Sequence, residues 1–340
     1  MRSVYYSLVA FALIGCFVFW VFFTYKEIYL AYERAIQSSI QASIVKTRLA
    51  DTLVNQKREL KLAFVGDIML SREVGDIMLR ENDFAYPFRE TAEALAGYDL
   101  TFGNLEGPIS AHGRNQGSIY SFRADPRVVE GLAAAGFNVL SLANNHIWDW
   151  GRDALADTVT LLGEKNIATV GAGRNEAEAN APAILRVGDV RVGFLAYTDL
   201  YPSGLIAHGE LPGISDFSLA KATQAVADLK RNADIVVVSF HWGDEYKTKA
   251  SANQRKIAHA LIDAGADIIA GHHPHVVEET EQHKNGWIAY SLGNFIFDMT
   301  RAGTTEGLLL EVTVNNKSVK SVTVRKVRIT MPDYIPVIAD

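Results

Sequence analysis

The chain has 340 residues, 49% of them hydrophobic, which is enough to bury one large core or two modest ones. Its formal net charge of −6 provides no basic surface for nucleic acid, so we expect no nucleic-acid partner. The single cysteine, Cys16, excludes an intrachain disulfide and a cysteine-based zinc module.

The first 25 residues predict a transmembrane signal anchor. Residues 4–23 are almost all apolar and carry no charge, and such a run can cross the ~30 Å hydrocarbon layer as a helix. Aromatic residues lie near its two ends, as they do at membrane interfaces, at Tyr5, Tyr6, Trp20 and Tyr25. The flanking basic residues are too few to decide the orientation. We expect a single-pass protein of the cell membrane.

Two other readings of this segment stay open. Residues 13–16, Leu-Ile-Gly-Cys, resemble a lipobox, which would make Cys16 the first residue of a lipoprotein. The apolar run continues through residues 17–23, however, and this favours Cys16 as a small membrane residue. A cleaved signal peptide is the other alternative, and no small-x-small cleavage site followed by a polar segment supports it.

Residues 26–60 predict a stalk between the anchor and the rest of the chain. No glycine or proline occurs between Cys16 and Val65, and good helix formers are frequent. A continuous helix over this stretch would reach about 50 Å. A partly disordered linker is the alternative. We assign the remaining residues, 61–340, to one domain.

Five apolar segments in this domain predict buried strands, each followed by acid, amide or histidine side chains. They are residues 62–65 before Asp67, 99–102 before Asn104 and Glu106, 138–142 before Asn144, Asn145, His146 and Asp149, 234–240 before His241 and Glu245, and 266–271 before His272, His273 and His275. In α/β sheets ligands bind outside the carboxyl ends of the strands. We therefore expect these side chains to converge on one site.

The last segment, which we expect Gly271 to close, indicates the chemistry of that site. Three imidazoles at one strand end are costly to desolvate, and they repel one another when protonated. A metal ion removes both problems, because neutral imidazole is its commonest protein ligand. The sequence therefore predicts a metal site built from histidine, carboxylate and amide groups.

Helical segments alternate with the strands, at residues 126–135, 152–164, 219–232 and 253–264. This alternation is typical of an α/β fold. After Trp287 the pattern changes to strands at 287–292, 307–314 and 318–329, and the last two read as an antiparallel pair. We expect a layered α/β core with a second, partly antiparallel sheet.

Six motifs together resemble the poly-γ-glutamate capsule biosynthesis protein family (CapA, also called PgsA), a branch of the calcineurin-like metallophosphoesterases. They are Gly66-Asp67-Ile68-Met69-Leu70, Gly103-Asn104-Leu105-Glu106, Asn144-Asn145-His146 with Asp149 and Gly151, His241-Trp242-Gly243-Asp244-Glu245, Gly271-His272-His273-Pro274-His275 and Ser291-Leu292-Gly293-Asn294-Phe295. The resemblance covers residues 60–300. It implies a four-layer αββα sandwich with a dimetal centre, placed outside the cytoplasm behind an N-terminal membrane anchor.

The resemblance also implies roles for individual residues. It gives metal ligation to Asp67, Glu106, Asn145, His241, His273 and His275, and contact with a phosphoryl group to His146, which could protonate the leaving oxygen. Asn104, Asp149 and Glu245 would support these groups without binding metal, and His272, which has no counterpart in the family's His-x-His pattern, would either support them or lie at the surface. The ligand set suits two divalent ions of manganese, iron or zinc.

Two departures from the classical phosphoesterase pattern affect this site. Met69 stands where those enzymes have the histidine of Asp-x-His, and Gly-Asn-Leu-Glu replaces Gly-Asp-x-x-Asp. Asp76 lies in a second Gly-Asp-Ile-Met-Leu copy, which follows no apolar strand, so we assign it to a helix or loop. Residues 86–88 and 121–123 are candidates for lining the cleft.

Three functions are compatible with these features. The first is a membrane-anchored component of poly-γ-glutamate synthesis or export that binds the anionic polymer beside membrane-embedded synthase subunits. The second is a free-standing surface metallophosphoesterase acting on nucleotides or phosphorylated glycans. The third is a catalytically silent scaffold. The resemblance favours the first, with the domain as a metal-dependent hydrolase.

Overall fold

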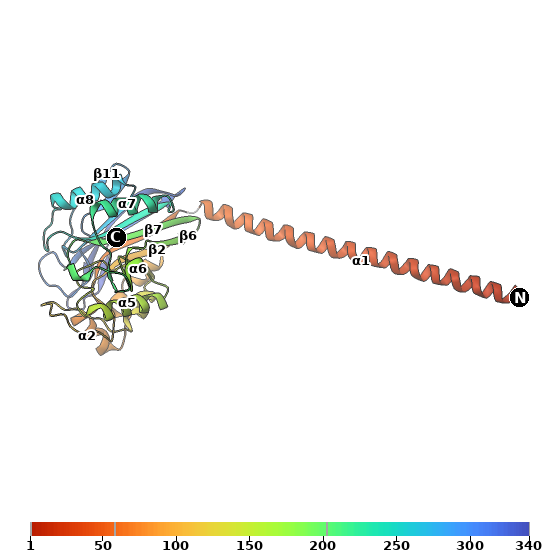
Figure 1. Cartoon of the computed structure of the whole chain (residues 1–340), viewed down its shortest axis with the longest axis horizontal. Helices are drawn as coiled ribbons and strands as arrows, with labels where there is room; N and C mark the ends of the chain where they lie inside the picture. Colours follow the sequence, from red (N-terminus) through yellow and green to blue (C-terminus); the bar gives the residue numbers. More distant parts are fainter. Residues whose placement is uncertain (1, 58, 202, 340) are drawn as a thin grey trace. The chain divides into compact units, whose positions relative to one another are not determined.

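The computed structural model describes residues 2–57, 59–201 and 203–339 and divides into two units, residues 1–58 and 59–340. The first unit is one unbroken helix, α1 (Arg2–Lys57), shown in Figure 1. No glycine or proline after Gly15 interrupts it, so the stalk segment is helical rather than irregular. Its Leu13–Leu49 part includes a stretch long and apolar enough to cross a membrane, by length and composition. Side chains such as Phe17 and Phe22 are exposed there.

The second unit contains two mixed β-sheets. The first has the strand order β16-β15-β14-β1-β2-β3-β4, and β13 also pairs with β1. Its strands are β1 (Leu60–Ile68), β2 (Leu100–Leu105), β3 (Phe137–Ser141), β4 (Ala168–Val170), β13 (Asn294–Ile296), β14 (Glu306–Asn315), β15 (Ser318–Ile329) and β16 (Pro336–Ile338). Strands β1 to β4 run parallel, whereas β14, β15 and β16 pair antiparallel.

The second sheet has the order β11-β12-β10-β9-β7-β6. Its strands are β6 (Ala183–Val187), β7 (Val190–Thr198), β9 (Ile235–His241), β10 (Ile268–His272), β11 (Thr280–His283) and β12 (Gly286–Ala289). The four central strands are parallel, and the edge strands β6 and β11 are antiparallel to their neighbours. A separate two-stranded ribbon joins β5 (Ala172–Gly173) to β8 (Gly213–Ile214).

Helices cover the outer faces of both sheets. They are α2 (Arg72–Glu81), α3 (Ala92–Ala96), α4 (Val128–Ala134), α5 (Gly151–Glu164), α6 (Glu176–Asn180), α7 (Leu219–Lys230) and α8 (Ala252–Asp263), with the 3-10 turns η1 (Tyr86–Phe88) and η2 (Ser203–Leu205). In Figure 1, α7 and α8 lie on one side of the strands and α2 and α5 on the other. The unit therefore has four layers, helix, sheet, sheet and helix.

Three buried apolar clusters join these layers. One packs α2, α4 and α5 on the first sheet, and another packs α7 and α8 on the second. The third lies between the sheets, where the rings of Phe102 and Phe194 stack with centroids 5.6 Å apart. Burying aromatic side chains of this size contributes roughly 1.5–3 kcal/mol each. The sandwich thus holds the ends of both sheets in fixed positions.

The expected four-layer αββα sandwich is confirmed, with two differences of detail. The C-terminal strands β14 and β15 are antiparallel, as predicted, but they extend the first sheet through β1 instead of forming the second sheet. The first strand also runs to Ile68, so Asp67 lies inside it. Gly271 likewise lies within β10 and does not end it.

Candidate metal centre

Strand register places the first polar groups of the site. Asp67 on β1 is opposite Asn104 on β2, and His241 on β9 is opposite His272 on β10. The two pairs meet between the sheets, because Asn104 Nδ2 lies 3.4 Å from His241 Nδ1. Parallel strands present their carboxyl ends at the same edge of a sheet, so loops from distant parts of the sequence converge there.

Asp67 is the most connected group of the site. Its carboxylate accepts hydrogen bonds from Asn104 Nδ2 (2.9 Å) and from the backbone N–H of His273 (3.2 Å). Its oxygens also lie 3.2 Å from His272 Nδ1 and 3.5 Å from His275 Nδ1. Burial opposes ionisation, but His272, His275 and Asn104 together hold the pKa of Asp67 below its usual value. Asp67 is therefore a buried anion, fixed in position.

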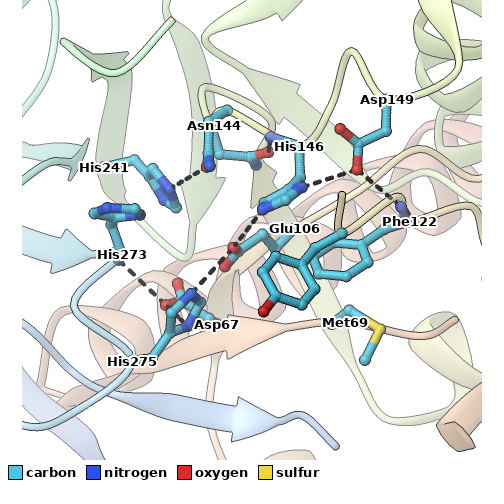
Figure 2. Close-up of polar contacts among 12 residues, drawn as sticks. Asp67, Met69, Glu106, Phe122, Asn144, His146, Asp149, His241, His273 and His275 are labelled. Carbon is cyan, nitrogen blue, oxygen red and sulfur yellow. Dashed lines mark hydrogen bonds and ion pairs between the residues drawn. The ribbon is translucent and has the colours of Figure 1, made fainter. Parts of the chain in front are cut away.

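Glu106 is buried without a hydrogen-bond partner for either carboxylate oxygen. Oε1 lies 3.6 Å from His275 Nε2 and 3.9 Å from His146 Nε2 (Figure 2). Burial and repulsion from Asp67 raise its pKa well above the ordinary value. An unpaired buried carboxylate is costly unless a cation compensates for it.

The histidines proposed as ligands are neutral. Burial and mutual repulsion lower the pKa of His241 well below its usual value, and burial lowers the pKa of His273 to about 4. The pKa of His275 is lowered in the same way, chiefly by burial. Neutral imidazole is the form that binds metal, and metal binding does not have to displace a proton from it.

The backbone at two of these histidines is unusual. His273 has φ 97° and His275 has φ 57°, in the left-handed region that favours glycine. Such conformations cost of order 1–3 kcal/mol each and cluster at functional sites. The loop after β10 is thus held in a form that turns the His275 imidazole toward Asp67 and Glu106 and the His273 imidazole toward His241, with ring centroids 4.8 Å apart, as Figure 2 shows.

Asp149 and Phe122 hold the His146 side chain in position. Its Nδ1 donates to Asp149 Oδ2 (2.8 Å), which also accepts the backbone N–H of Phe122 (2.8 Å). The Phe122 ring packs on the imidazole with centroids 4.2 Å apart. Because Asp149 fixes the Nδ1–H tautomer, Nε2 faces Glu106 and the open side of the site.

Asn145 belongs to the same site, because its Oδ1 lies 2.8 Å from His241 Nε2. His272 is fully buried beside Asp67, so it is not a surface residue. Glu245 is exposed at the rim of the cleft. Met69 is buried and its sulfur accepts from Ser71, away from the histidines (Figure 2).

Two secondary expectations have different outcomes. Phe122 lines the cleft, as proposed for residues 121–123. Tyr86 and Phe88 do not, because η1 packs into the hydrophobic core against α2 and α4. Asp76 is an exposed residue of α2, as the absence of a preceding strand predicts.

Two asparagines of the motifs have functions that sequence reasoning missed. Asn294 Oδ1 lies 3.0 Å from His275 Nδ1, and its Nδ2 donates to Thr304 O (2.9 Å). Asn144 Oδ1 accepts the N–H groups of His146 and Ile147, and its Nδ2 donates to Leu105 O (2.8 Å). Their place directly after strands was a usable signal, since buried amides hold loops in place.

The residues present fit a divalent cation. Donor atoms of Asp67, Glu106 and His275 lie within 4.8 Å of one another. The unpaired oxygens of Glu106 and the unpaired Nδ1 of His273 are buried groups that a cation would satisfy. A cleft of about 220 Å³ leads to them, lined by Arg72, Tyr120, Phe122, His146, Glu245, Tyr246, His275, Asp298, Met299, Thr300 and Arg301.

Comparison with known proteins agrees with this arrangement. Residues 61–299 match the family model of the bacterial capsule synthesis protein PGA_cap. The chain is 38% identical over 264 residues to the capsule biosynthesis protein CapA of Bacillus anthracis, covering 75% of this chain and 64% of that protein. It is 33% identical over 255 residues to the PGA biosynthesis protein CapA of Bacillus subtilis (strain 168), covering 74% and 67%. The match thus spans slightly less than two thirds of the Bacillus anthracis protein.

The fold also has a relative among solved structures. A hypothetical protein from Thermus thermophilus aligns with a TM-score of 0.50 and 17% identity, covering 78% of this chain and 98% of that one. This likeness concerns the fold alone. The family match rests on the sequence, and it includes every residue of the candidate centre, all of the second sheet and the first sheet except β14, β15 and β16. The chain therefore belongs to the bacterial capsule synthesis protein family.

Proposed function

We propose that this protein is a membrane-anchored component of poly-γ-glutamate capsule synthesis or export, and that its α/β domain is a metal-dependent hydrolase of the phosphoesterase type. The names of the relatives support the capsule function, since two of them are CapA proteins. The helix α1 supports anchoring. We further propose that residues 61–340 lie outside the cytoplasm. The site supports the hydrolase.

One observation carries the hydrolase proposal, the environment of Glu106. Both of its oxygens are buried and unpaired, and donor atoms of Asp67 and His275 lie within 4.8 Å. A carboxylate between two groups of ligands can bridge two cations, and oxygen and imidazole donors suit manganese, iron or zinc. Asp67 and His275 lie together on one side of Glu106, and Asn145, His241 and His273 lie together on the other, so these residues would hold the ions.

Bound divalent ions would supply an activated water and stabilise charge on a transferring phosphoryl group. The chain's own residues do the rest. Asp149 holds a proton on His146 Nδ1 and would stabilise the doubly protonated imidazolium, whose Nε2–H could then donate to a leaving oxygen at the mouth of the site. Phe122 covers one face of this imidazole and limits its movement.

The arginines of the cleft, together with the proposed divalent ions, would favour an anionic substrate, although the carboxylates Glu245 and Asp298 also line the cleft. Arg72 and Arg301 line it, and the Arg301 guanidinium lies 4.0 Å from the centre of the Tyr246 ring. Asp298 partly neutralises Arg72, with its Oδ2 3.1 Å from Nε. Positive groups at the mouth of a site concentrate anions there. Poly-γ-glutamate, which membrane-embedded synthase subunits would supply, is such an anion.

Metal analysis and turnover of a generic aryl phosphate test the hydrolase proposal. The purified full chain in detergent should contain divalent metal and cleave the ester. His241→Ala should lose metal, and His146→Ala should keep metal but lose turnover. His112→Ala is the matched control, because this exposed histidine also faces one carboxylate, Asp157 at 3.1 Å. Wild-type protein without bound metal would refute the hydrolase and leave the scaffold.

Purification from native membranes tests the capsule proposal separately. The anchored protein should bring down synthase subunits, and its loss should reduce the polymer at the cell surface. Unchanged polymer together with metal-dependent turnover would instead identify a free-standing surface phosphoesterase. The two experiments can therefore fail independently.

A further inference from the structure

A second cluster of histidines and carboxylates joins α8 to the edge strand β11 and shares no residue with the candidate metal centre. His259 and Asp263 lie four residues apart on α8, so they project from the same face of the helix. Glu281 and His283 alternate on β11 and therefore lie on the same face of the strand. The four side chains come from two elements, α8 and β11, and strand β10 with a loop on each side lies between them in the sequence.

The contacts in this cluster are short and specific. His259 Nε2 lies 2.8 Å from Glu281 Oε1, and His283 Nε2 lies 2.9 Å from Asp263 Oδ1. The two imidazole rings stack with centroids 4.0 Å apart and an angle of 6° between their planes. Two rings this close would repel if both were protonated. Each Nε2 already points at a carboxylate oxygen.

We propose that His259, Glu281 and His283 bind one divalent transition-metal ion of the zinc type. Donor atoms of these three residues lie within 4.8 Å of one another. Zinc binds imidazole nitrogen and carboxylate oxygen at about 2.0–2.2 Å, usually tetrahedrally, so its ligands lie about 3.3 Å apart. Small side-chain rotations would close the difference. Magnesium and calcium prefer all-oxygen sites, and the two imidazoles select against them.

Neighbouring groups support Glu281 as a ligand. Its other oxygen, Oε2, accepts from Arg255 (2.9 Å) and from the Tyr290 hydroxyl (2.9 Å), which leaves Oε1 directed at His259. A ligating carboxylate is commonly oriented by such outer hydrogen bonds. Asp263 also forms an ion pair with Lys284 (2.6 Å). We therefore assign its carboxylate to the hydrogen bond with His283 and not to the metal ion.

Such an ion would tie the edge of the second sheet to its covering helix. β11 is the last strand of the sheet and pairs only with β12 among the described strands. Binding to the folded state alone would raise stability in proportion to the logarithm of the ion concentration. The clamp would also connect α8, which follows the His241 loop, to β11, which follows the His275 loop. This site does not depend on the proposed hydrolase function.

Zinc content measured by mass spectrometry tests the proposal on the full chain in detergent. The protein is stripped with chelator, equilibrated with micromolar free zinc and desalted. His259→Ala/His283→Ala should hold one zinc equivalent less than the wild type and should show a smaller rise in melting temperature with zinc. In a His241→Ala/His273→Ala background, the same double substitution should again remove one equivalent.

His112→Ala and His208→Ala are the matched controls, since each removes an exposed histidine near a single carboxylate, at 3.1 Å and 3.7 Å. Both should keep the wild-type zinc content. If the double variant does not fold, His283→Gln alone should lose the same equivalent. Equal zinc content in the wild type and the folded cluster variants would overturn the proposal.

Discussion

Replacing Gly271 by alanine should disrupt the candidate centre through the backbone. Gly271 precedes His272 within β10, where the chain passes close to the end of β12. A Cβ at this position would lie 1.9 Å from Tyr290 O and 2.8 Å from Ala289 O. Both neighbours are backbone atoms, so no side-chain rotation can relieve the overlap.

The expected magnitude follows from this geometry. The Cβ would need to be about 1.5 Å farther from Tyr290 O for ordinary contact, which requires β10 and β12 to separate. Overpacking alone costs about 1–3 kcal/mol, and each lost backbone hydrogen bond costs about 1 kcal/mol more. We therefore expect Gly271→Ala to lower the free energy of unfolding by at least about 3 kcal/mol. The shift should also displace His272 and His273 and reduce the metal content.

Urea unfolding of the full chain, followed by tryptophan fluorescence, measures this change, because Trp242 is fully buried. Gly163→Ala makes the same chemical change on α5, where nothing lies within 4 Å of the added Cβ. It should stabilise the protein by about 0.5–1 kcal/mol. Equal stability of the two variants, with full metal content in Gly271→Ala, would refute the steric argument.

Three further substitutions test the polar groups. Asp149→Asn should lower aryl phosphate turnover at least about 10–100-fold without changing metal content, because it removes the negative charge that holds the proton on His146 Nδ1; a parallel loss of metal would contradict this role. Glu106→Gln should lose at least one metal equivalent in mass spectrometry, yet stabilise the metal-free protein in urea at neutral pH, because burial raises the pKa of this carboxyl and penalises its charge. Burial also raises the pKa of Glu278 to about 7. The free energy of unfolding should therefore be highest below the ordinary carboxyl pKa, and it should fall by about 1–2 kcal/mol as the pH rises through 7. Glu278→Gln, which can still accept from Gln254, should lack this fall, and superimposable pH profiles of unfolding would exclude the effect.

The sequence was informative where chemistry and local pattern coincide. Apolar strands followed by acids, amides and histidines are visible as letters, and Asp67, Glu106 and His275 do converge. The sequence could not predict which sheet the C-terminal strands join, because β14 pairs with β1, and the paired residues are about 250 positions apart in the chain. The left-handed backbone of His273 was equally hidden, since histidine, although enriched at positive φ, adopts it at too few positions for the sequence to predict it.

Glycine illustrates the same limit within one motif. Gly271 suggests a strand end, because glycine commonly marks turns. In the structure it continues β10 and permits close approach of another backbone. A glycine is compatible with a strand end and with a continuous strand. Only the adjacent backbone in the folded structure distinguishes the two. Similarly, Asn294 orients His275 across 19 residues of sequence, a contact that no local pattern contains.

Three costly features of the centre have one common explanation. The carboxylate of Glu106 is buried without a partner, His273 and His275 adopt left-handed backbone conformations, and several imidazoles are kept neutral in close proximity. Each feature alone costs on the order of 1–3 kcal/mol, and natural domains are stable by only about 5–15 kcal/mol. A fold retains such costs together only if one compensation serves all of them. A cation bound among these groups would neutralise Glu106, accept the neutral imidazoles and stabilise the strained loop that presents them. Packing against the hydrophobic core could offset the strain, but it could not satisfy the carboxylate, so the charge of Glu106 is the strongest argument for a metal.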